Sequence, residues 1–337
     1  MRKLFFIILV LILTCAGGFA WWIFLAPNIN SEKKVSIKIR TGSTYDEVVS
    51  LLSDNNILKD EFSFSIVSRL KHYPEQVRAG YYVFNRNMNN RQIVNMLRLG
   101  LQTPVTLVIY NIRTKEEFAG LIGRTIEIDS AKFLSLLDST KFCRGYGLDT
   151  NNILTRIQMD NYEFYWNTHP NKFFEKIDSA YSHFWNDERR AKAQSIHLTP
   201  TEVTILASIV EKEVMRDKEL PTVAGVYLNR LKIGMPLQAD PTLVFALRDF
   251  DARRVTSYHK EYDSPYNTYK YAGLPPGPVC IPRKKSIEAV LNAEQHDFLY
   301  FCANPDLSGY SIFSKTYEEQ MKTAAQYRKK LDEMHVH

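Results

Sequence analysis

The N-terminal segment constrains the fold of this chain more than any other, because residues 4–26 contain no charged side chain. An apolar run of this length matches the roughly 20 residues that a helix needs to cross a hydrocarbon core of about 30 Å. Arg2 and Lys3 precede the run, and basic residues favour the cytoplasmic side of a membrane. We therefore expect a cytoplasmic tip at residues 1–3, a transmembrane anchor at residues 4–26 and export of the rest of the chain.

A cleaved signal peptide is the alternative to an anchor, because Gly18, Phe19 and Ala20 form a small–x–small cleavage pattern. The apolar run continues beyond this pattern, however, and Trp21 and Trp22 stand where aromatic side chains accumulate at membrane interfaces. This continuation favours an uncleaved, single-pass anchor in the cytoplasmic (inner) membrane, with the remaining domains in the periplasm or on the extracytoplasmic side.

The composition is that of folded domains, with 45% hydrophobic and 24% charged residues in a chain of 337 residues. The net charge of +6 is spread along the sequence, which argues against a nucleic-acid partner. The four cysteines have neither close spacing nor companion histidines, so we expect no metal and no cofactor. Cys280 and Cys302 are the pair that an exported domain would join in a disulfide, and separate thiols are the alternative.

Residues 35–102 show the pattern of a small α+β module. Alternation at residues 35–39 predicts a strand, and a capping pattern at residues 43–46 predicts the start of a helix. The elements that follow are a helix at about 61–70, a strand at 79–84 and a helix at about 90–99. This β-α-α-β order resembles the LysM-type carbohydrate-binding modules, and a spacer domain is an equal interpretation.

Residues 103–197 form an intermediate region that begins with a predicted strand at 105–110 and is otherwise largely helical. Its aromatic side chains recur at helical spacing, which is typical of a core. The aromatic cluster at residues 162–166 has a second interpretation, as a platform for sugar rings. The fold class expected for the whole chain is therefore α+β: a transmembrane helix, the small module, and a mixed α+β catalytic domain that ends with residues 198–337.

A predicted helix near residue 200 carries the strongest chemical signal. Thr199, Pro200 and Glu202 form a capping pattern, and apolar residues follow at helical spacing to make one apolar face. Glu211 and Glu213 flank the end of that face on opposite sides. A carboxyl group at such a border is partly desolvated, which raises its pKa and lets it donate a proton. The spacing leaves both glutamates as candidate acids, and ordinary surface glutamates as the alternative.

Two further observations bear on this helix. Ala207 and Ser208 have small side chains one turn earlier and leave space for a ligand beside Glu211. Downstream, QADPT at 238–242 predicts a turn that caps a helix, YNTY at 266–269 offers amide, hydroxyl and aromatic groups, and GLPPGP at 273–278 predicts a stiff loop. In this order, the strings indicate a cleft that holds a sugar.

These strings resemble the endolytic murein transglycosylases of the YceG-like family. The resemblance rests on ASIVEKE at 207–213, VYLNRL at 226–231, LYF at 299–301 and the three downstream strings, and the anchor and LysM-like module match the family's order. The sequence departs from the family at residues 160–168, which leaves the subsite contacts open. The resemblance implies that the first glutamate of the helix, Glu211, is the catalytic residue.

The resemblance also implies the reaction, a non-hydrolytic cleavage of the β-1,4 bond between N-acetylmuramic acid and N-acetylglucosamine in peptidoglycan. Glu211 would protonate the leaving oxygen and then accept the proton of the muramic acid 6-hydroxyl as a 1,6-anhydro ring closes. A single acid suffices because no water needs activation. By the same resemblance, cleavage is endolytic and terminates nascent glycan strands, and peptidoglycan synthases are the expected protein partners.

Six more residues are candidates for substrate binding or for orienting the acid: Gln238, Asp240, Tyr266, Asn267, Arg230 and Glu213. Asp240 has the alternative of a helix cap, and in a muramidase-like hydrolase it would be the second carboxylate. Arg230 would bind a carboxylate of the glycan or form an internal ion pair. A non-enzymatic, membrane-tethered wall-binding scaffold is the alternative from another functional class.

Overall fold

The computed structural model describes residues 2–252 and 255–333, and the chain divides into two compact units. Unit 1 takes residues 1–107, 122–129 and 162–169, and unit 2 takes residues 108–121, 130–161 and 170–337. The predicted α+β class with an apolar N-terminal helix is confirmed. The LysM-like character of the first module and the boundaries at residues 102 and 197 stay predictions.

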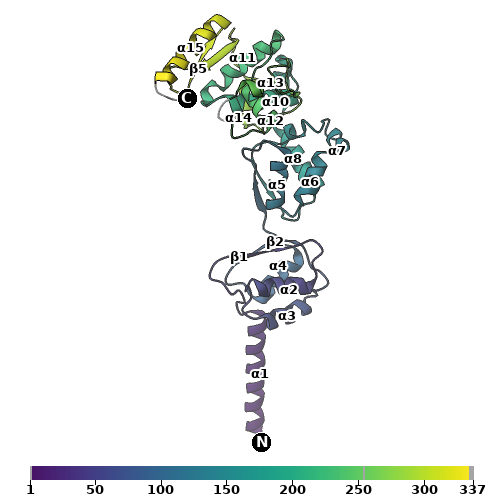
Figure 1. Ribbon diagram of the computed structural model, residues 1–337. Coiled ribbons are helices and arrows are strands. Elements are labelled where there is room, and N and C mark those ends of the chain that lie inside the picture. The colour runs from purple at the N-terminus through teal and green to yellow at the C-terminus, as the bar shows by residue number, and fades with distance from the viewer. Residues whose placement is uncertain (1, 253–254, 334–337) are drawn as a thin grey trace. The chain divides into compact units, whose positions relative to one another are not determined.

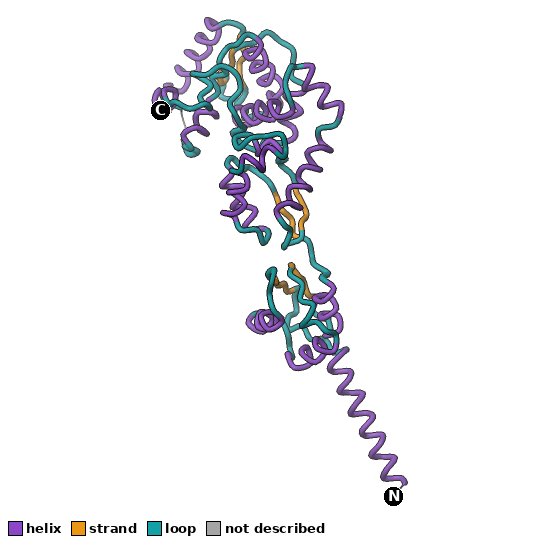
Figure 2. Tube along the Cα trace, turned by 90° about the vertical axis from the view of Figure 1, so that its right-hand side faces the viewer, coloured by secondary structure: helices purple, strands orange, loops and turns teal. Residues whose placement is uncertain are grey.

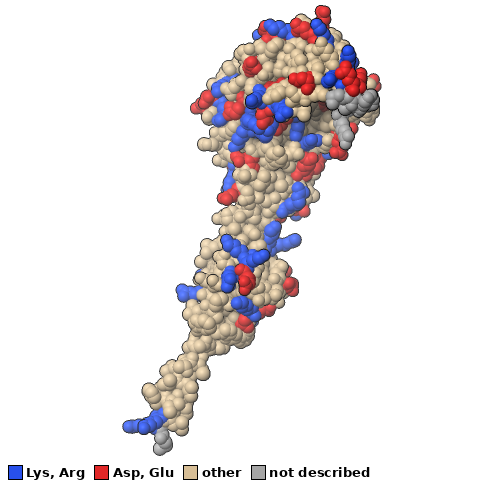
Figure 3. Space-filling view, turned by 90° about the vertical axis from the view of Figure 1, so that its left-hand side faces the viewer, with Lys and Arg blue, Asp and Glu red and all other residues tan. Residues whose placement is uncertain are grey.

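Unit 1 begins with α1 (Arg2–Phe24), which is one unbroken helix (Figure 2). It is long enough to cross a membrane, with a mean hydropathy of 2.5, and its basic side chains lie at its N-terminal end (Figure 3). Its last turn belongs to the folded module, because Ile23 is buried and its carbonyl oxygen accepts a hydrogen bond of 2.9 Å from Asn90 Nδ2. The apolar helix therefore continues into the module without a linker.

The module contains the predicted β-α-α-β order, followed by one more helix. Its elements are β1 (Val35–Ile39), α2 (Tyr45–Asp54), α3 (Glu61–Leu70), β2 (Gly80–Phe84) and α4 (Asn90–Leu99). β1 and β2 pair antiparallel, with Ile37 opposite Tyr82. Capping boxes at Thr44 and Asn89 explain why α2 and α4 start where they do, since each satisfies backbone N–H groups of the first turn.

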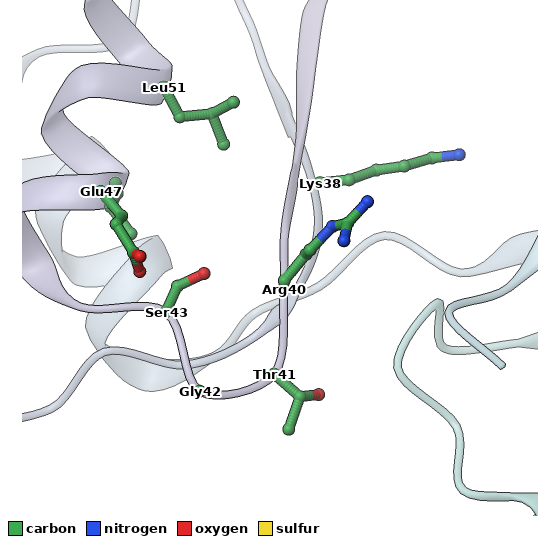
Figure 4. Close-up of a pocket in the computed structure, with 8 residues that line it drawn as sticks. Lys38, Arg40, Thr41, Gly42, Ser43, Glu47 and Leu51 are labelled. Atoms are coloured by element: carbon green, nitrogen blue, oxygen red, sulfur yellow. The ribbon is translucent and has the colours of Figure 1, made fainter. Parts of the chain in front are cut away.

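A pocket of about 390 Å³ lies at the turn between β1 and α2 (Figure 4). Lys38, Arg40 and Thr41 line one part of it and Glu47 of α2 another. The turn is held by Glu127, whose carboxylate accepts hydrogen bonds from the backbone N–H and the hydroxyl of Thr41 at 2.7 and 2.6 Å. This pocket is where the carbohydrate-binding role predicted for the module would be sought.

The intermediate region combines a two-stranded sheet with short helices. Its elements are β3 (Val105–Val108), α5 (Lys115–Thr125), α6 (Ser130–Leu137), α7 (Thr140–Arg144), β4 (Asn161–Phe164), α8 (Pro170–Phe184) and α9 (Asp187–Ser195), with β3 paired to β4. In the aromatic cluster, Tyr162, Phe164 and Trp166 are buried and only Tyr165 is exposed. The sugar-stacking interpretation is therefore wrong for these three rings, which belong to the core.

The rest of unit 2 is built around one buried helix, α10 (Pro200–Glu213). The other elements are η2 (Asp217–Glu219), α11 (Leu220–Lys232), α12 (Asp240–Leu247), α13 (Ser257–Glu261), α14 (Lys284–Leu291), β5 (Tyr300–Ala303), β6 (Ser311–Ser314) and α15 (Tyr317–Glu333). α10 packs against α11, α12 and α14 (Figure 1). Every residue from Val203 to Val210 is buried, so the prediction of a single apolar face is wrong: neighbouring helices surround α10 until its last turn.

Candidate active site

The last turn of α10 brings both candidate acids to the edge of the core of unit 2. The helix begins at the predicted capping box, where Thr199 and Glu202 satisfy each other's backbone N–H groups. It ends at Glu213, two residues after Glu211. The buried stretch before them fixes the direction of the last turn, so the two carboxyl groups have defined and different surroundings.

Glu211 forms an ion pair and a hydrogen bond with the start of α14. Arg283 Nε donates to its Oε1 and Ser286 Oγ donates to its Oε2, and its side chain is 11% exposed. Arg283 also pairs with Asp217 at 3.0 Å. Because both carboxylate oxygens already have strong donors, this group is arranged as an anion that joins two helices.

The space beside Glu211 that the sequence predicted is filled by protein. Ala207 and Ser208 are fully buried, and Ser208 Oγ accepts a 3.0 Å hydrogen bond from the backbone N–H of Val279. Cys280 Sγ lies 3.6 Å from the carbonyl oxygen of Ser208. The small side chains therefore admit the loop that follows the GLPPGP string, and the expectation of room for a ligand there is wrong.

Glu213 has the opposite character. The residue is half-buried, and its Oε2 atom is shielded from solvent without a hydrogen-bond partner among the described residues. Burial and, to a smaller extent, the charge of Asp240 raise the pKa of Glu213 to about 8, against the lowering effects of Arg230 and of a hydrogen bond with Tyr227. The C-terminal end of a helix also disfavours an anion. At neutral pH this carboxyl group holds its proton.

Asp240 and Tyr269 interact electrostatically with Glu213. Asp240 is exposed at the start of α12, and its Oδ1 accepts a 2.5 Å hydrogen bond from the hydroxyl of Tyr269. Burial raises the pKa of Tyr269, and the hydrogen bond to Asp240 and the charge of Asp240 raise it further. The QADPT and YNTY strings therefore meet at Glu213.

Two buried threonines join these strings. The hydroxyl oxygens of Thr242 and Thr268 are 2.8 Å apart, and Thr268 Oγ1 accepts a 3.0 Å hydrogen bond from the backbone N–H of Ala239. The carbonyl oxygen of Thr268 accepts a further bond from the N–H of Gln238 at 2.9 Å. Buried polar groups of this kind are costly unless all are paired, so the threonines fix Asp240 and Tyr269 in position.

The other candidate residues divide into exposed and structural ones. The side chain of Gln238 is exposed, with a φ of 49°, and is free to contact a ligand. Asn267 is fully buried, donates to the carbonyl oxygens of Lys260 and Tyr262, and accepts from the N–H of Tyr269, so all of its polar atoms serve the loop. These bonds occupy the side-chain amide of Asn267, and the sugar contact expected of it stays a prediction.

Arg230 and Tyr266 also have internal partners. Arg230 is buried and donates to the carbonyl oxygens of Leu299 and Leu237, so its guanidinium group holds these two backbone segments, and its role toward a glycan carboxylate stays a prediction. Tyr266 packs against Phe245 with ring centroids 4.8 Å apart, and burial raises its pKa to about 12. Both residues shape the site from within the core.

A cleft of about 420 Å³ opens beside Glu213. Its lining includes a second carboxylate, Glu219, and the aromatic residues Phe301, Tyr310 and Tyr327. Glu219 Oε1 accepts a 2.6 Å hydrogen bond from a backbone N–H of the β6 hairpin, so it is already used in the fold. A cleft with aromatic walls and one protonated acid is suited to an uncharged polar ligand such as a glycan.

The cysteines take no part in this cleft as a disulfide. All four are free, with Cys143 and Cys280 buried and Cys302 half-buried. The disulfide between Cys280 and Cys302 is therefore wrong, and the alternative of separate thiols is correct. Burial raises the pKa of Cys280 to about 12, which makes its thiol unreactive.

The GLPPGP loop makes a tight contact that yields a stability prediction. A Cβ atom on Gly277 would lie 2.1 Å from the carbonyl oxygen of Asn151 and 2.7 Å from the hydroxyl of Tyr266. We expect Gly277→Ala to lower the free energy of unfolding by about 3 kcal/mol, because the backbone must move. Gly273→Ala in the same loop meets no atom within 4 Å and has a φ of +92°, so we expect a loss of only about 1 kcal/mol. Equal midpoints of urea unfolding for the two variants would contradict the close contact.

Comparison with known proteins identifies the family of this chain. The model of the YceG-like family matches residues 37–326 of the chain. The chain belongs to the YceG-like family. The endolytic murein transglycosylase of Bacillus subtilis strain 168 is 28% identical over 94% of this chain and 91% of its own length. That of Streptococcus pneumoniae serotype 2 strain D39 is 26% identical over 94% of this chain and 63% of its own length.

A solved structure of the YceG-like family has the same fold. The crystal structure of a YceG-like protein from Listeria monocytogenes covers 87% of this chain and 99% of its own, with a TM-score of 0.59 and 28% identity. Within this YceG-like chain, sequence reasoning missed Arg283, Ser286 and Tyr269. The signal for the first two was the polar run 283–286, which stands between the proline-rich loop and the apolar residues of α14.

Proposed function

We propose that this YceG-like chain is a peptidoglycan lytic transglycosylase and that Glu213 is its catalytic acid and base. The observation that carries the proposal is a carboxyl group with a pKa of about 8 at the edge of a cleft with aromatic walls. Catalytic acids have pKa values near the working pH. The names of the Bacillus and Streptococcus relatives supply the substrate, murein.

The surroundings of the two glutamates support Glu213 over Glu211, the residue that the resemblance selected. A general acid must hold a proton and release it to a substrate oxygen within reach. Glu211 accepts bonds from Arg283 and Ser286 with both oxygens, which stabilises its anionic form. Glu213 lines the cleft, and its shielded Oε2 atom has no donor among the described residues that would stabilise an anion.

The proposed reaction needs no water and no second carboxylate. Glu213 gives its proton to the oxygen that joins N-acetylmuramic acid to the next N-acetylglucosamine, and the bond from C1 to that oxygen breaks. The 6-hydroxyl oxygen of the muramic acid then bonds to C1, and its proton passes to Glu213. One acid is thereby restored and one 1,6-anhydro end is formed, so atoms and charge balance.

Asp240 and Tyr269 have a supporting role in this proposal. The negative charge of Asp240 raises the pKa of Glu213 and thereby keeps it protonated. The same charge favours the cationic character that develops at the anomeric carbon. Gln238, which is exposed two residues before Asp240, is the proposed contact for a sugar amide or hydroxyl.

The location of this chemistry at the cell wall is part of the proposal. We propose that α1 spans the cytoplasmic membrane with its basic N-terminal end inside and that the catalytic unit is exported. Endolytic cleavage at a membrane-tethered site acts on strands while they are still close to the membrane. Termination of nascent glycan strands and a partner among the peptidoglycan synthases follow as parts of the same proposal.

Product analysis tests the reaction. Digestion of intact peptidoglycan by the wild-type chain is expected to give muropeptides with 1,6-anhydro ends, about 18 Da lighter than their hydrolysed counterparts because no water is added. Mass spectrometry before and after borohydride reduction distinguishes the two, since only hydrolysed ends are reduced. A wild-type digest with reducible ends alone would favour a muramidase-like hydrolase in which Asp240 is the second carboxylate. No soluble product at all would favour the wall-binding scaffold.

A further inference from the structure

A groove of about 470 Å³ lies in unit 1 where α1 enters the folded module. Its walls combine small and aromatic residues of α1 with two cations of the module: Gly17, Ala20, Trp21, Lys71 and Arg91. Lys71 follows the end of α3, and Arg91 lies in the first turn of α4. One wall of the groove is therefore the apolar helix α1, and the other wall, formed by the module, is positively charged.

The depth of the groove follows from the helix. If the hydrocarbon core of about 30 Å begins at Leu4, a rise of 1.5 Å per residue carries α1 through it in about 20 residues. Gly17 and Ala20 then face the outer acyl chains, and Trp21 lies about 4 to 5 Å inside the outer boundary of the core. In this orientation Lys71 and Arg91, which line the same groove, lie near that outer boundary.

The two cations have no ion-pair partner among residues 2–252 and 255–333. Lys71 is half-buried and Arg91 is exposed. Elsewhere in unit 1 the Arg86 guanidinium lies 4.0 Å from Glu32, so acids are present in the module but do not neutralise the groove. The groove therefore carries positive charge near the outer boundary of the core.

Exposed apolar side chains continue this surface along α3. Phe62 and Leu70 are each 62% exposed, and the ring of Phe62 stacks on that of Trp22 at 6.5 Å. Exposed aromatic and aliphatic side chains of this kind are stable at a membrane interface but not in water. The membrane-facing end of the module is thus apolar around a cationic groove.

We propose that this groove binds an anionic phospholipid of the outer leaflet. One acyl chain lies along Gly17 and Ala20, and the phosphate bonds to Lys71 and Arg91. The lipid would fix the height and rotation of the module above the membrane, because α1 continues into the module without a linker. This inference rests on the proposed membrane anchor and is independent of the glycan-cleaving reaction.

Tryptophan quenching in vesicles tests the proposal with the full-length chain. In a Trp22→Phe background, Trp21 is the reporter in the groove, while Trp166 and Trp185 are buried and give a constant signal. The chain is reconstituted in phosphatidylcholine vesicles that contain an increasing mole fraction of phosphatidylglycerol. In one series phosphatidylglycerol carries the bromine quencher, and in the other series phosphatidylcholine carries it. We expect brominated phosphatidylglycerol to quench at a lower mole fraction than brominated phosphatidylcholine.

The variants give the size of the effect. A cation near an anionic headgroup favours it about fivefold, so Lys71→Gln or Arg91→Gln should lower the preference about fivefold and the double variant about 25-fold. Arg86→Gln, which removes the same charge outside the groove, should leave it unchanged. The measurement is repeated with inorganic phosphate at tens of millimolar, which should not displace the lipid.

Each other outcome overturns the inference in a distinct way. Equal quenching by the two lipids would show an anchor without a lipid site, and no quenching by either would remove the anchor itself. Quenching that weakens as the protein-to-lipid ratio rises would assign the groove to a second copy of the chain. Loss of the preference in phosphate would assign it to a soluble anion. Glycan cleavage measured in the same vesicles shows separately whether the proposed reaction holds.

Discussion

Replacement of Glu213 by Gln is expected to lower the rate of glycan cleavage by at least about 10³-fold while the chain stays folded. A positioned proton donor contributes up to about 10⁴-fold, and in the proposed reaction the same group also serves as the base. Gln keeps the size and hydrogen-bonding capacity of the side chain but cannot give up a proton. The rate is measured as release of soluble muropeptides, with circular dichroism and unfolding midpoints to verify the fold.

Glu211→Gln is the matched control, because it makes the same chemical change two residues away. Gln at this position leaves the Arg283 guanidinium without one of its two anionic partners, Glu211 and Asp217. We expect a loss of stability of about 1 to 2 kcal/mol and a loss of activity below about tenfold. An inactive but stable Glu211→Gln protein together with an active Glu213→Gln protein would return the catalytic role to Glu211.

The local signals in the sequence were sufficient for the elements. Caps at Thr44, Asn89 and Thr199 fix where helices begin, since a side chain that satisfies first-turn N–H groups is a local device. The antiparallel pair of β1 and β2 follows from two alternating segments in one small module. The apolar run of α1 needs only length and composition. These predictions involve residues that are close in the chain.

The sequence was sufficient to locate the site, but not to decide which of its two glutamates is the catalytic acid. The surroundings of the two glutamates depend on partners far away in the chain, namely Arg283 and Ser286 for Glu211 and Asp240 for Glu213. Helical spacing places both glutamates at the border of the core and says nothing of what packs there.

Some residues of the sequence motifs have a structural role that their spacing does not reveal. Asn267, Arg230 and Ser208 have the chemistry of ligand contacts, and the structure uses them to bind backbone groups of neighbouring loops. A buried polar residue that supports a loop and an exposed one that binds a sugar have the same letters in a sequence. Only burial separates Asn267 from the exposed Gln238.

The raised pKa of Glu213 leads to the second large effect, which is a dependence of both rate and stability on pH. The acid must be protonated, so glycan cleavage should fall as the pH rises through about 8. Asp240 raises this pKa, and Asp240→Asn should therefore move the fall in rate to lower pH. The measurement is the apparent second-order rate constant between pH 5 and 10, and a profile of Asp240→Asn shifted to higher pH would contradict the proposed coupling.

Stability gives a test of the same pKa that does not depend on activity. The pKa of Glu213 is near its ordinary value of 4.5 in the unfolded chain and near 8 in the folded chain. Between these two pH values the unfolded state has released a proton that the folded state still holds. The free energy of unfolding therefore falls as the pH rises from 4.5 to 8. Gln at position 213 does not titrate. Compared at pH 5 and at pH 9, Glu213→Gln should gain roughly 4 kcal/mol in the free energy of unfolding relative to wild type. Glu211→Gln, which leaves the carboxyl group of Glu213 in place, is the matched control variant. We therefore expect Glu213→Gln to be inactive and yet more stable than wild type at high pH, because the surroundings of Glu213 in the folded protein disfavour its anion.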